Sequence, residues 1–344
     1  MDTVAQLASE ERAELFTETA ARMGVFPIIA EKDFWVCWAL KTLFAHPGER
    51  PGLLFKGGTS LSKVFHVIER FSEDIDLSLN RHDLGFTGDR DPLNAASYSQ
   101  ANRLGKELEA ECKSYIVDRQ LPALARDFAS VLADDADDWQ LVIDEIDAQT
   151  INFRYPRGLA PAEYEGYRYV RPTVRLEFGA RSDHWPAAMH SVTPYAAEFF
   201  PDHFQVPSFQ VNTLAVERSF WEKVTLLHSE YHRPHTSPPR QNPSRHYYDV
   251  AMLARTGIKQ RALEDLGLLA QVAKHKDYLF HTGWSNYAEA VPGTMRLLPH
   301  PDLEKPLRND YADLQEMIFR DPPTFEQVLE EVGHIEEEVN SLKV

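Results

Sequence analysis

The stretch Leu53–Asn80 constrains the fold of this 344-residue chain more than any other. It opens with a short apolar run, Leu53–Phe55, which has the length of a buried strand and is followed by two glycines. Apolar residues at helical spacing then predict a helix that extends to Ile68, and a second strand is predicted at Ile75–Leu79. The pattern therefore predicts a strand, a glycine turn, a helix and a strand in succession.

Two carboxylates belong to the second predicted strand. Asp74 and Asp76 flank Ile75, and because side chains alternate along a strand, both carboxylates should point to the same face while Ile75 points into the core. Two like charges on one face repel each other, and a cation between them removes that repulsion. Oxygen ligands at this spacing suit Mg²⁺, which binds through a few carboxylates together with substrate phosphates, and Mn²⁺ is an alternative.

The glycine pair predicts a phosphate site beside these carboxylates. Gly57 and Gly58 allow backbone N–H groups to approach a phosphate closely, and the start of the following helix adds a favourable dipole. Thr59 and Ser60 either cap that helix or offer their hydroxyls to the same anion.

The order KGGTSLSK (residues 56–63) followed by RFSEDIDL (residues 70–77) resembles the nucleotidyltransferase superfamily and, more closely, the AbiEii toxin family. Members of this family are the toxins of type IV toxin–antitoxin and phage abortive-infection systems. One departure is that fifteen residues separate Gly58 from Asp74, slightly more than in the broader superfamily. The resemblance implies an α/β (α+β) core with a mixed sheet at residues 1–215, a helical insertion at about 95–135, and a helical domain at 216–344 that completes the nucleotide site.

A second part of the resemblance lies further along the chain. WEK, which ends at Lys223, and SRHYYD, which ends at Asp249, are similar to the later motifs of the family. The resemblance implies that Lys223 contacts the nucleotide, and Asp249 could hold Lys223 or Arg245 in position. The alternative is that Lys223 is an exposed helix lysine and Asp249 a charge in the first turn of its helix.

A third metal-binding carboxylate is expected on a strand beside the first two, again by resemblance. In Arg171–Gly179, buried and polar positions alternate, and Glu177 is the candidate. The alternative is that Glu177 only pairs with Arg175 on an exposed sheet face, and Asp144 is a weaker substitute for the metal role.

Several other polar residues near these motifs are candidate nucleotide contacts. Arg70 could instead pair with Asp74 or Glu69, and Lys63 could instead face solvent. The complete set of further candidates is Lys56, Lys63, Arg70, Ser72 and Arg245.

An aromatic-rich helix is predicted at Glu31–Phe44, with Trp35 and Trp38 as core residues. Glu31–Asp33 are expected to form its solvated first turn. The alternative is that Lys32 faces the nucleotide. A hairpin is expected from Trp139–Ile146 and Thr150–Tyr155. Helices are expected at Ser97–Leu132, with Pro122 marking a break or a second start, and from Asn212 to His228. The acidic run Asp134–Asp138 is expected to be a solvated turn.

Bulk properties limit the function. No signal peptide or membrane-spanning run is apparent, so a cytoplasmic protein is expected. The net charge of −17 opposes a general affinity for nucleic acid, but residues 216–262 hold eight Lys or Arg against four Asp or Glu. The clustered histidines, namely His228, His232, His235 and His246, do not have the spacing of a closed zinc site.

The resemblance implies transfer of a nucleoside monophosphate from an NTP to RNA, in particular to the 3′ end of transfer RNA, with neutralisation by a cognate antitoxin. One alternative puts a protein or a small molecule at the acceptor, which the negative charge favours. A different class is a nucleotide sensor that binds the triphosphate without transferring it.

Overall fold

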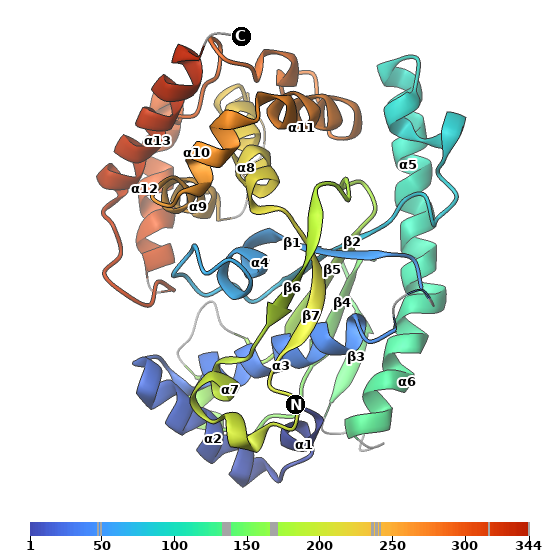
Figure 1. The fold of residues 1–344 in the computed structure, drawn as a ribbon, viewed down its shortest axis with the longest axis vertical. Coiled ribbons are helices and arrows are strands. Elements are labelled where there is room, and N and C mark those ends of the chain that lie inside the picture. The colour runs from blue at the N-terminus through green and yellow to red at the C-terminus, as the bar shows by residue number, and fades with distance from the viewer. Residues whose placement is uncertain are drawn as a thin grey trace. The chain divides into compact units, whose positions relative to one another are not determined.

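The computed structural model describes residues 1–342 apart from 47, 49, 133–138, 166–170, 235–236, 238–239, 241 and 316. The chain forms two compact units, each described here by itself (Figure 1). Unit 1 contains Met1–Val64, Phe71–Gly85 and Glu107–Thr213, and unit 2 contains Phe65–Arg70, Phe86–Lys106 and Leu214–Val344. The segments of the two units are therefore interleaved along the sequence.

Unit 1 is built on a seven-stranded sheet with the order β3-β4-β5-β2-β1-β7-β6. β2 pairs antiparallel with β1 and parallel with β5, and β1 also pairs parallel with β7, so the sheet is mixed. The predicted α/β class with a mixed sheet is confirmed. The strands are β1 (Leu53–Lys56), β2 (Ile75–Leu79), β3 (Gln140–Ile143), β4 (Thr150–Arg154), β5 (Val174–Gly179), β6 (Ala187–Val192) and β7 (Phe209–Leu214).

The alternation of apolar and polar residues determines which side chains of the neighbouring strands β2 and β5 face the core. Ile75 and Leu77 of β2 and Leu176 of β5 are buried, while the intervening polar residues are only partly buried. Because a shift of one residue would send these apolar side chains to the other face, burial fixes the register. That register pairs Asp76 with Glu177 on β5 and with Lys56 on β1. The predicted hairpin is also confirmed, since β3 pairs antiparallel with β4.

An aromatic core packs a long helix, α3, on this sheet. Trp35 and Trp38 of α3 are fully buried, and their rings lie 5.9 and 6.0 Å from the ring of Phe153 on β4. The core role predicted for both tryptophans is confirmed. The helices in this part of the chain are α1 (Asp2–Ala5), α2 (Ser9–Met23), α3 (Pro27–Leu43), α4 (Gly57–Lys63), α5 (Tyr98–Tyr115), α6 (Leu121–Leu132) and α7 (Tyr195–Phe199).

Several expected element boundaries are wrong. The helix after the glycines ends at Lys63, not Ile68, and His66 then adopts a left-handed conformation (φ 51°) that a helix cannot continue through. The helix expected from Asn212 begins at Val216 instead, since residues up to Leu214 belong to β7.

The predicted long helix at Ser97–Leu132 is divided between α5 and α6. A π-helical turn, Ile116–Gln120, joins the two without a break in the helical backbone, and Pro122 is the second residue of α6. The run Asp134–Asp138 lies outside the described residues. β6 and α7 were not predicted from the sequence.

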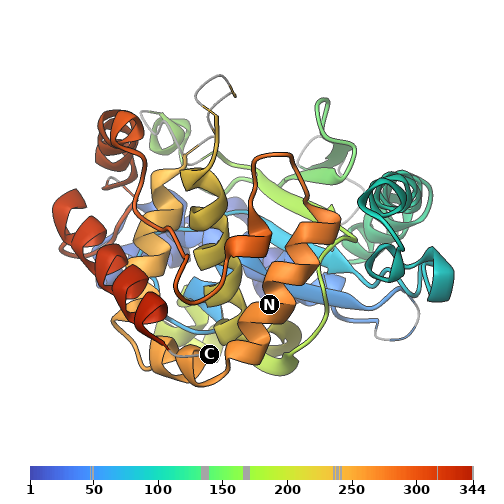
Figure 2. The same ribbon diagram turned by 90° about the horizontal axis from the view of Figure 1, so that it is seen from above.

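Unit 2 is helical (Figure 2). α8 and α9 contact each other; α10 and α11 pack on α8, and α12 and α13 pack on α9. Phe220, Val224 and Leu227 form a buried stripe on α8, and each has no more than 1% of its surface exposed. Among the described residues, no helix is both long and apolar enough to cross a membrane. These helices are α8 (Val216–Tyr231), α9 (Ser244–Ala254), α10 (Ile258–Glu264), α11 (Leu266–Leu279), α12 (Pro301–Gln315) and α13 (Phe325–Ser341).

Candidate active site

The turn between β1 and α4 brings a glycine against a carboxylate. Gly57 has φ +79°, a conformation that residues with a side chain rarely adopt. A Cβ at this position would lie 1.8 Å from Oδ2 of Asp76, which is far inside van der Waals contact. Only glycine fits here, and its absent side chain lets the Asp76 carboxylate lie directly against the glycine turn. The spatial proximity expected between the two motifs is therefore present.

The hydroxyl of Thr59 fastens this turn to the segment that carries the carboxylates, and the hydroxyl of Ser60 closes the turn on itself. Thr59 Oγ1 donates to the carbonyl oxygen of Asp74 at 2.5 Å and lies 3.0 Å from Ser72 Oγ, and Ser60 Oγ donates to the carbonyl of Gly57 at 2.8 Å. Both side chains are fully buried. Their hydrogen bonds hold the turn in shape, and neither hydroxyl caps α4. Anion binding by these hydroxyls stays a prediction.

Glu177 completes a cluster of carboxylates. It lies beside Asp76 in the parallel pairing of β2 with β5. Burial, followed by the negative charges of Asp74 and Asp76, raises the pKa of Glu177 to about 7, although Arg175 opposes this change. Burial is the larger cause of this change, and repulsion from the two neighbouring carboxylates adds to it.

Arg175 lies within this cluster. Its Nε and Nη2 each lie 3.1 Å from Glu177 Oε1, and Nε lies 3.8 Å from Asp74 Oδ1. Nη1 is 4.0 Å from Oδ2 of Asp144, the residue that follows β3. Both alternatives for Glu177 therefore hold geometrically: it stands beside the paired carboxylates, and it pairs with Arg175.

The donor chemistry of the cluster suits magnesium. Asp74, Asp76 and Glu177 offer only oxygen ligands, which a hard cation prefers, and their repulsion would be relieved by a positive ion. Within the described parts of the chain, however, no three His, Cys, Asp or Glu side chains are gathered closely enough to hold a metal ion as they stand. Arg175 occupies part of the space among them.

The charged residues Glu31–Asp33 of α3 are buried, so the expectation that they form a solvated first turn is wrong. α3 begins at Pro27, so Glu31–Asp33 lie inside the helix, with at most 2% of each residue exposed. Nζ of Lys32 donates a 2.5 Å hydrogen bond to Oε2 of Glu73, the residue that precedes Asp74. Burial lowers the pKa of Lys32 and raises that of Glu73, because both groups lose their hydration.

The other two charges of this turn also find buried partners. Glu31 accepts hydrogen bonds from the backbone N–H of Gly158 and from the hydroxyl of Tyr164, both at 2.7 Å. Asp33 pairs with Lys63 at 2.7 Å, and the Lys63 ammonium lies 3.6 Å from the ring centre of Tyr195. The alternative of a solvent-facing Lys63 is wrong. Its ammonium is committed to Asp33, so a phosphate contact by Lys63 stays a prediction.

Unit 2 contains a different ionic cluster, centred on Asp249. The Asp249 carboxylate is fully buried; Arg70 donates to its two oxygens at 2.8 and 2.9 Å, and Lys223 Nζ lies 2.9 Å from Oδ2. Burial alone would raise the pKa of Asp249, but the two cations hold it well below its ordinary value. The predicted positioning of Lys223 by Asp249 is therefore present in the geometry. The alternatives of an exposed helix lysine for Lys223 and of a charge in the first helical turn for Asp249 are wrong, because Lys223 pairs with Asp249 and Asp249 is the sixth residue of α9.

The remaining basic and histidine candidates of unit 2 have other surroundings. Arg245 has a buried Nε with no hydrogen-bond partner among the described residues. His228 accepts the backbone N–H of Arg296 at Nδ1, and its Nε2 lies 3.0 Å from the carbonyl oxygen of Asn286, so both ring nitrogens serve the packing of this unit. Burial and the nearby cations Lys223 and Arg245 lower the pKa of His246. His235 lies outside the described residues.

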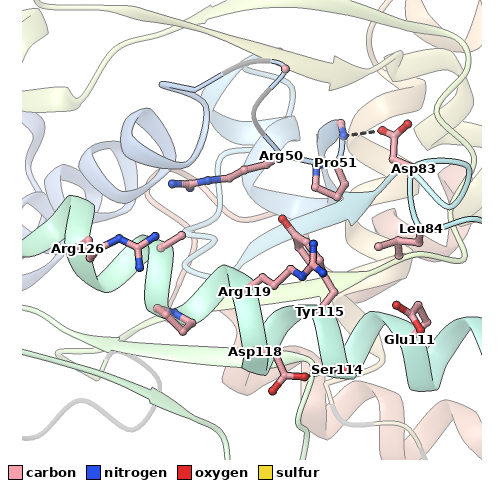
Figure 3. Close-up of a pocket in the computed structure, with 14 residues that line it drawn as sticks. Arg50, Pro51, Asp83, Leu84, Glu111, Ser114, Tyr115, Asp118, Arg119 and Arg126 are labelled. Carbon is pink, nitrogen blue, oxygen red and sulfur yellow. Dashed lines mark hydrogen bonds between the residues drawn. The ribbon is translucent and has the colours of Figure 1, made fainter.

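A pocket of about 1170 Å³ lies at the opposite end of β1 and β2 from the glycine turn (Figure 3). It lies between the segment that precedes β1, the residues that follow β2, and one face of the α5–α6 helical stretch. Its wall holds equal numbers of positive and negative side chains, and neither the glycine turn nor the paired carboxylates line it. It is not the phosphate hollow that the glycines predict. Its charged residues are Arg50, Arg119, Arg126, Asp83, Glu111 and Asp118.

Sequence reasoning missed the partners that hold the site. Glu73 received no role, yet it pairs with Lys32 just before Asp74 and β2. Arg175 was named only as a neighbour of Glu177, although it also reaches towards Asp74 and Asp144. The alternation within β5, which placed Arg175 on the face of Glu177, was the one available signal for this contact.

A mixed sheet that carries a glycine turn against paired carboxylates, with a third carboxylate on the next strand, defines a candidate nucleotidyltransferase. The family model described as "Nucleotidyl transferase AbiEii toxin, Type IV TA system" matches residues 38–331. The chain belongs to this family and is a nucleotidyltransferase toxin of a type IV toxin–antitoxin system.

Among solved structures, the chain is similar to MenT4, a nucleotidyltransferase toxin from Mycobacterium tuberculosis H37Rv. The two share 13% identity over 96% of this chain and 99% of that chain, with a TM-score of 0.39. Among curated proteins, none matches the sequence significantly.

Proposed function

We propose that this enzyme transfers a nucleoside monophosphate from an NTP to the 3′ end of an RNA, in particular transfer RNA, and that it uses Mg²⁺ or Mn²⁺. The observation that carries the proposal is the contact between the Asp76 carboxylate and the glycine turn, with Glu177 alongside. It brings oxygen donors for a divalent cation next to backbone donors for a phosphate.

In unit 1, Asp74, Asp76 and Glu177 would hold the metal. When bound, it would lower the pKa of the acceptor hydroxyl and neutralise the phosphates. The backbone of Gly57 and Gly58 would receive the β- and γ-phosphates. Lys56, which pairs in register with Asp76, is a further phosphate contact in this proposal. Thr59 and Ser60 would preserve the shape of the turn through their internal hydrogen bonds.

In unit 2, Lys223 is the proposed nucleotide-contacting cation. Asp249 fixes the ammonium position through its 2.9 Å contact, and Arg70 keeps that carboxylate charged. A fixed cation stabilises charge that develops on a leaving group because it needs no reorganisation during the reaction. Arg245 remains a second proposed phosphate contact on the same helix as Asp249.

In the proposed reaction the acceptor hydroxyl oxygen bonds to the α-phosphorus. The bond from that phosphorus to the α–β bridging oxygen breaks, pyrophosphate leaves with the electron pair, and the hydroxyl proton passes to solvent. NTPs and RNA are cytoplasmic, and we place the enzyme there. The type IV system implies a cognate antitoxin as partner.

The test supplies each of the four NTPs, labelled at the α-phosphate, to the purified protein with total RNA and total cellular protein. The proposal expects label in RNA of transfer-RNA size only when Mg²⁺ or Mn²⁺ is present, and none with Asp76→Asn. Label that enters protein or a small molecule, and never RNA, would overturn the proposed acceptor.

The net charge of −17 favours a protein or a small molecule as the acceptor, because a negatively charged chain does not attract RNA generally. A nucleotide sensor would give a third result. It would bind NTP without releasing pyrophosphate, and Asp76→Asn would leave transfer at the same zero level.

A further inference from the structure

The guanidinium of Arg175 lies among three carboxylates of unit 1. It contacts Glu177 at 3.1 Å and lies within 4.0 Å of both Asp74 and Asp144. Two of these three carboxylates, those of Asp74 and Glu177, are among the three proposed metal ligands. The guanidinium and a divalent cation would therefore bind the same carboxylate oxygen atoms.

The surroundings of Arg175 leave it free to move. Its side chain is 43% exposed, and it projects from the sheet face, so displacement towards solvent requires no change in the backbone of β5. Asp144 is held separately: it accepts hydrogen bonds from the side chain of Asn152 and from the backbone N–H groups of Ile146 and Asp147. Asp144 therefore remains available to receive the guanidinium when the other two carboxylates bind a metal.

We propose that Arg175 is an internal counter-ion that competes with the divalent metal for Asp74 and Glu177. Without metal, it offsets the repulsion among the carboxylates. A metal ion must displace it, so the affinity of the protein for the free ion is reduced. A metal that arrives with a triphosphate brings extra phosphate ligands, and it therefore overcomes the competition more readily than the free ion does. The inference rests on the proposed metal-binding function of these carboxylates.

The test measures binding of Mn²⁺ to the nucleotide-free, full-length protein by electron paramagnetic resonance titration. Arg175→Met removes the competing charge, and it should bind Mn²⁺ roughly three- to tenfold more tightly than the unmodified protein, the range expected for loss of one or two partly exposed ion pairs. Arg175→Lys keeps a cation and should bind as the unmodified protein does. Arg154→Met is the matched control, because Arg154 is an exposed arginine at the end of β4 whose side chain donates to Gln140.

A second measurement separates competition from a scaffold role. In the presence of a chelator, Arg175→Met should melt at a lower temperature than the unmodified protein, and saturating Mn²⁺ should remove most of that difference. A scaffold arginine would leave the loss in place with Mn²⁺, and binding would be equal or weaker in the variant. Either result would overturn the inference.

Failure of the proposed function has a different signature. If neither the unmodified protein nor Arg175→Met binds Mn²⁺, with or without a non-hydrolysable NTP, then these carboxylates hold no metal, and both proposals fall. If Mn²⁺ binds in both and Asp76→Asn abolishes it, the metal site stands, and only the relative affinities decide the role of Arg175.

Discussion

The two ionic clusters of this enzyme are opposite in composition. In unit 1, Asp74, Asp76 and Glu177 gather with Arg175, so negative charge is in excess. In unit 2, one carboxylate, Asp249, is shared by two cations. The same type of group therefore experiences opposite environments in the two units.

The pKa values of the two clusters record this difference. The pKa of Glu177 rises to about 7 because burial and like charges disfavour its ionised form, whereas the cations hold that of Asp249 well below its ordinary value. In the first cluster negative charge remains in excess of the one guanidinium, whereas in the second two cations of the protein itself surround a single carboxylate. Removal of one carboxylate should consequently have opposite effects on stability in the two units.

The largest effect is expected from Asp76→Asn. Loss of a proposed metal ligand should reduce nucleotidyl transfer by about a thousandfold, equivalent to about 4 kcal/mol of transition-state stabilisation. Because the substitution also removes one of three clustered charges, the melting temperature without metal should stay equal or rise. Transfer assays and thermal melts in a chelator check the two parts. A strong loss of stability in Asp76→Asn would contradict the view that negative charges repel one another in this cluster.

Asp249→Asn should show the reverse pattern. It leaves Arg70 and Lys223 buried without a countercharge, and breaking a buried pair in this way costs about 3–5 kcal/mol. Urea unfolding monitored by tryptophan fluorescence measures the loss. Asp310→Asn is a useful comparison, since Asp310 in the same unit accepts only a backbone N–H, that of Ser244, among the described residues. Equal stability losses in the two variants would mean that the ionic cluster contributes nothing beyond an ordinary hydrogen bond.

Gly57→Ala tests the contact between the glycine turn and Asp76. The positive φ alone should cost about 1–2 kcal/mol, and the added Cβ must also push the Asp76 carboxylate away. Gly24→Ala is the matched control: Gly24 also has positive φ (+71°), but its Cβ would meet nothing within 4 Å. We expect a larger loss of stability and a much larger loss of transfer in Gly57→Ala. Similar losses in both variants would show that the clash with Asp76 is relieved without consequence.

Sequence reasoning reached the first cluster better than the second, and the reason is physical. Asp74, Asp76 and Glu177 lie on or next to strands whose alternation is visible within a few residues, so their shared face follows from local spacing. Arg70 and Asp249 are 179 residues apart, and no periodicity connects them. The family motif indicated Asp249, but only the folded chain shows that Arg70 is its partner.

The error at Glu31–Asp33 has the same origin. Three consecutive charged residues ordinarily face solvent, and nothing local indicated otherwise. Each of these residues has a partner from a different segment: Gly158 and Tyr164 for Glu31, Glu73 for Lys32, and Lys63 for Asp33. Burial of charge is possible only where such partners converge, and that convergence is a property of the tertiary structure.

The smallest effect, and the most direct measure of the second cluster, is the pH dependence of Lys223→Met. Arg70 still neutralises Asp249 in this variant, so the stability loss at pH 7 should be only about 1–2 kcal/mol. The pKa of Asp249 is lower in the folded protein than its ordinary value of 3.8, so its contribution to stability is complete above that value and is lost as the pH falls through the lowered folded value.

The difference between the unmodified protein and Lys223→Met should therefore be constant from pH 8 down to about pH 4, and it should shrink only at still lower pH, as the pH falls through the lowered folded pKa that Arg70 maintains for Asp249 in the variant. Urea midpoints measured across this range check the expectation. A difference that already shrinks near pH 6 would point to a histidine, such as the buried His246 whose pKa Lys223 lowers, and not to Asp249. It would mean that Lys223 acts on His246 of α9 more than on Asp249, and the contrast between a cluster with excess negative charge and one with excess positive charge would then have no support in unit 2.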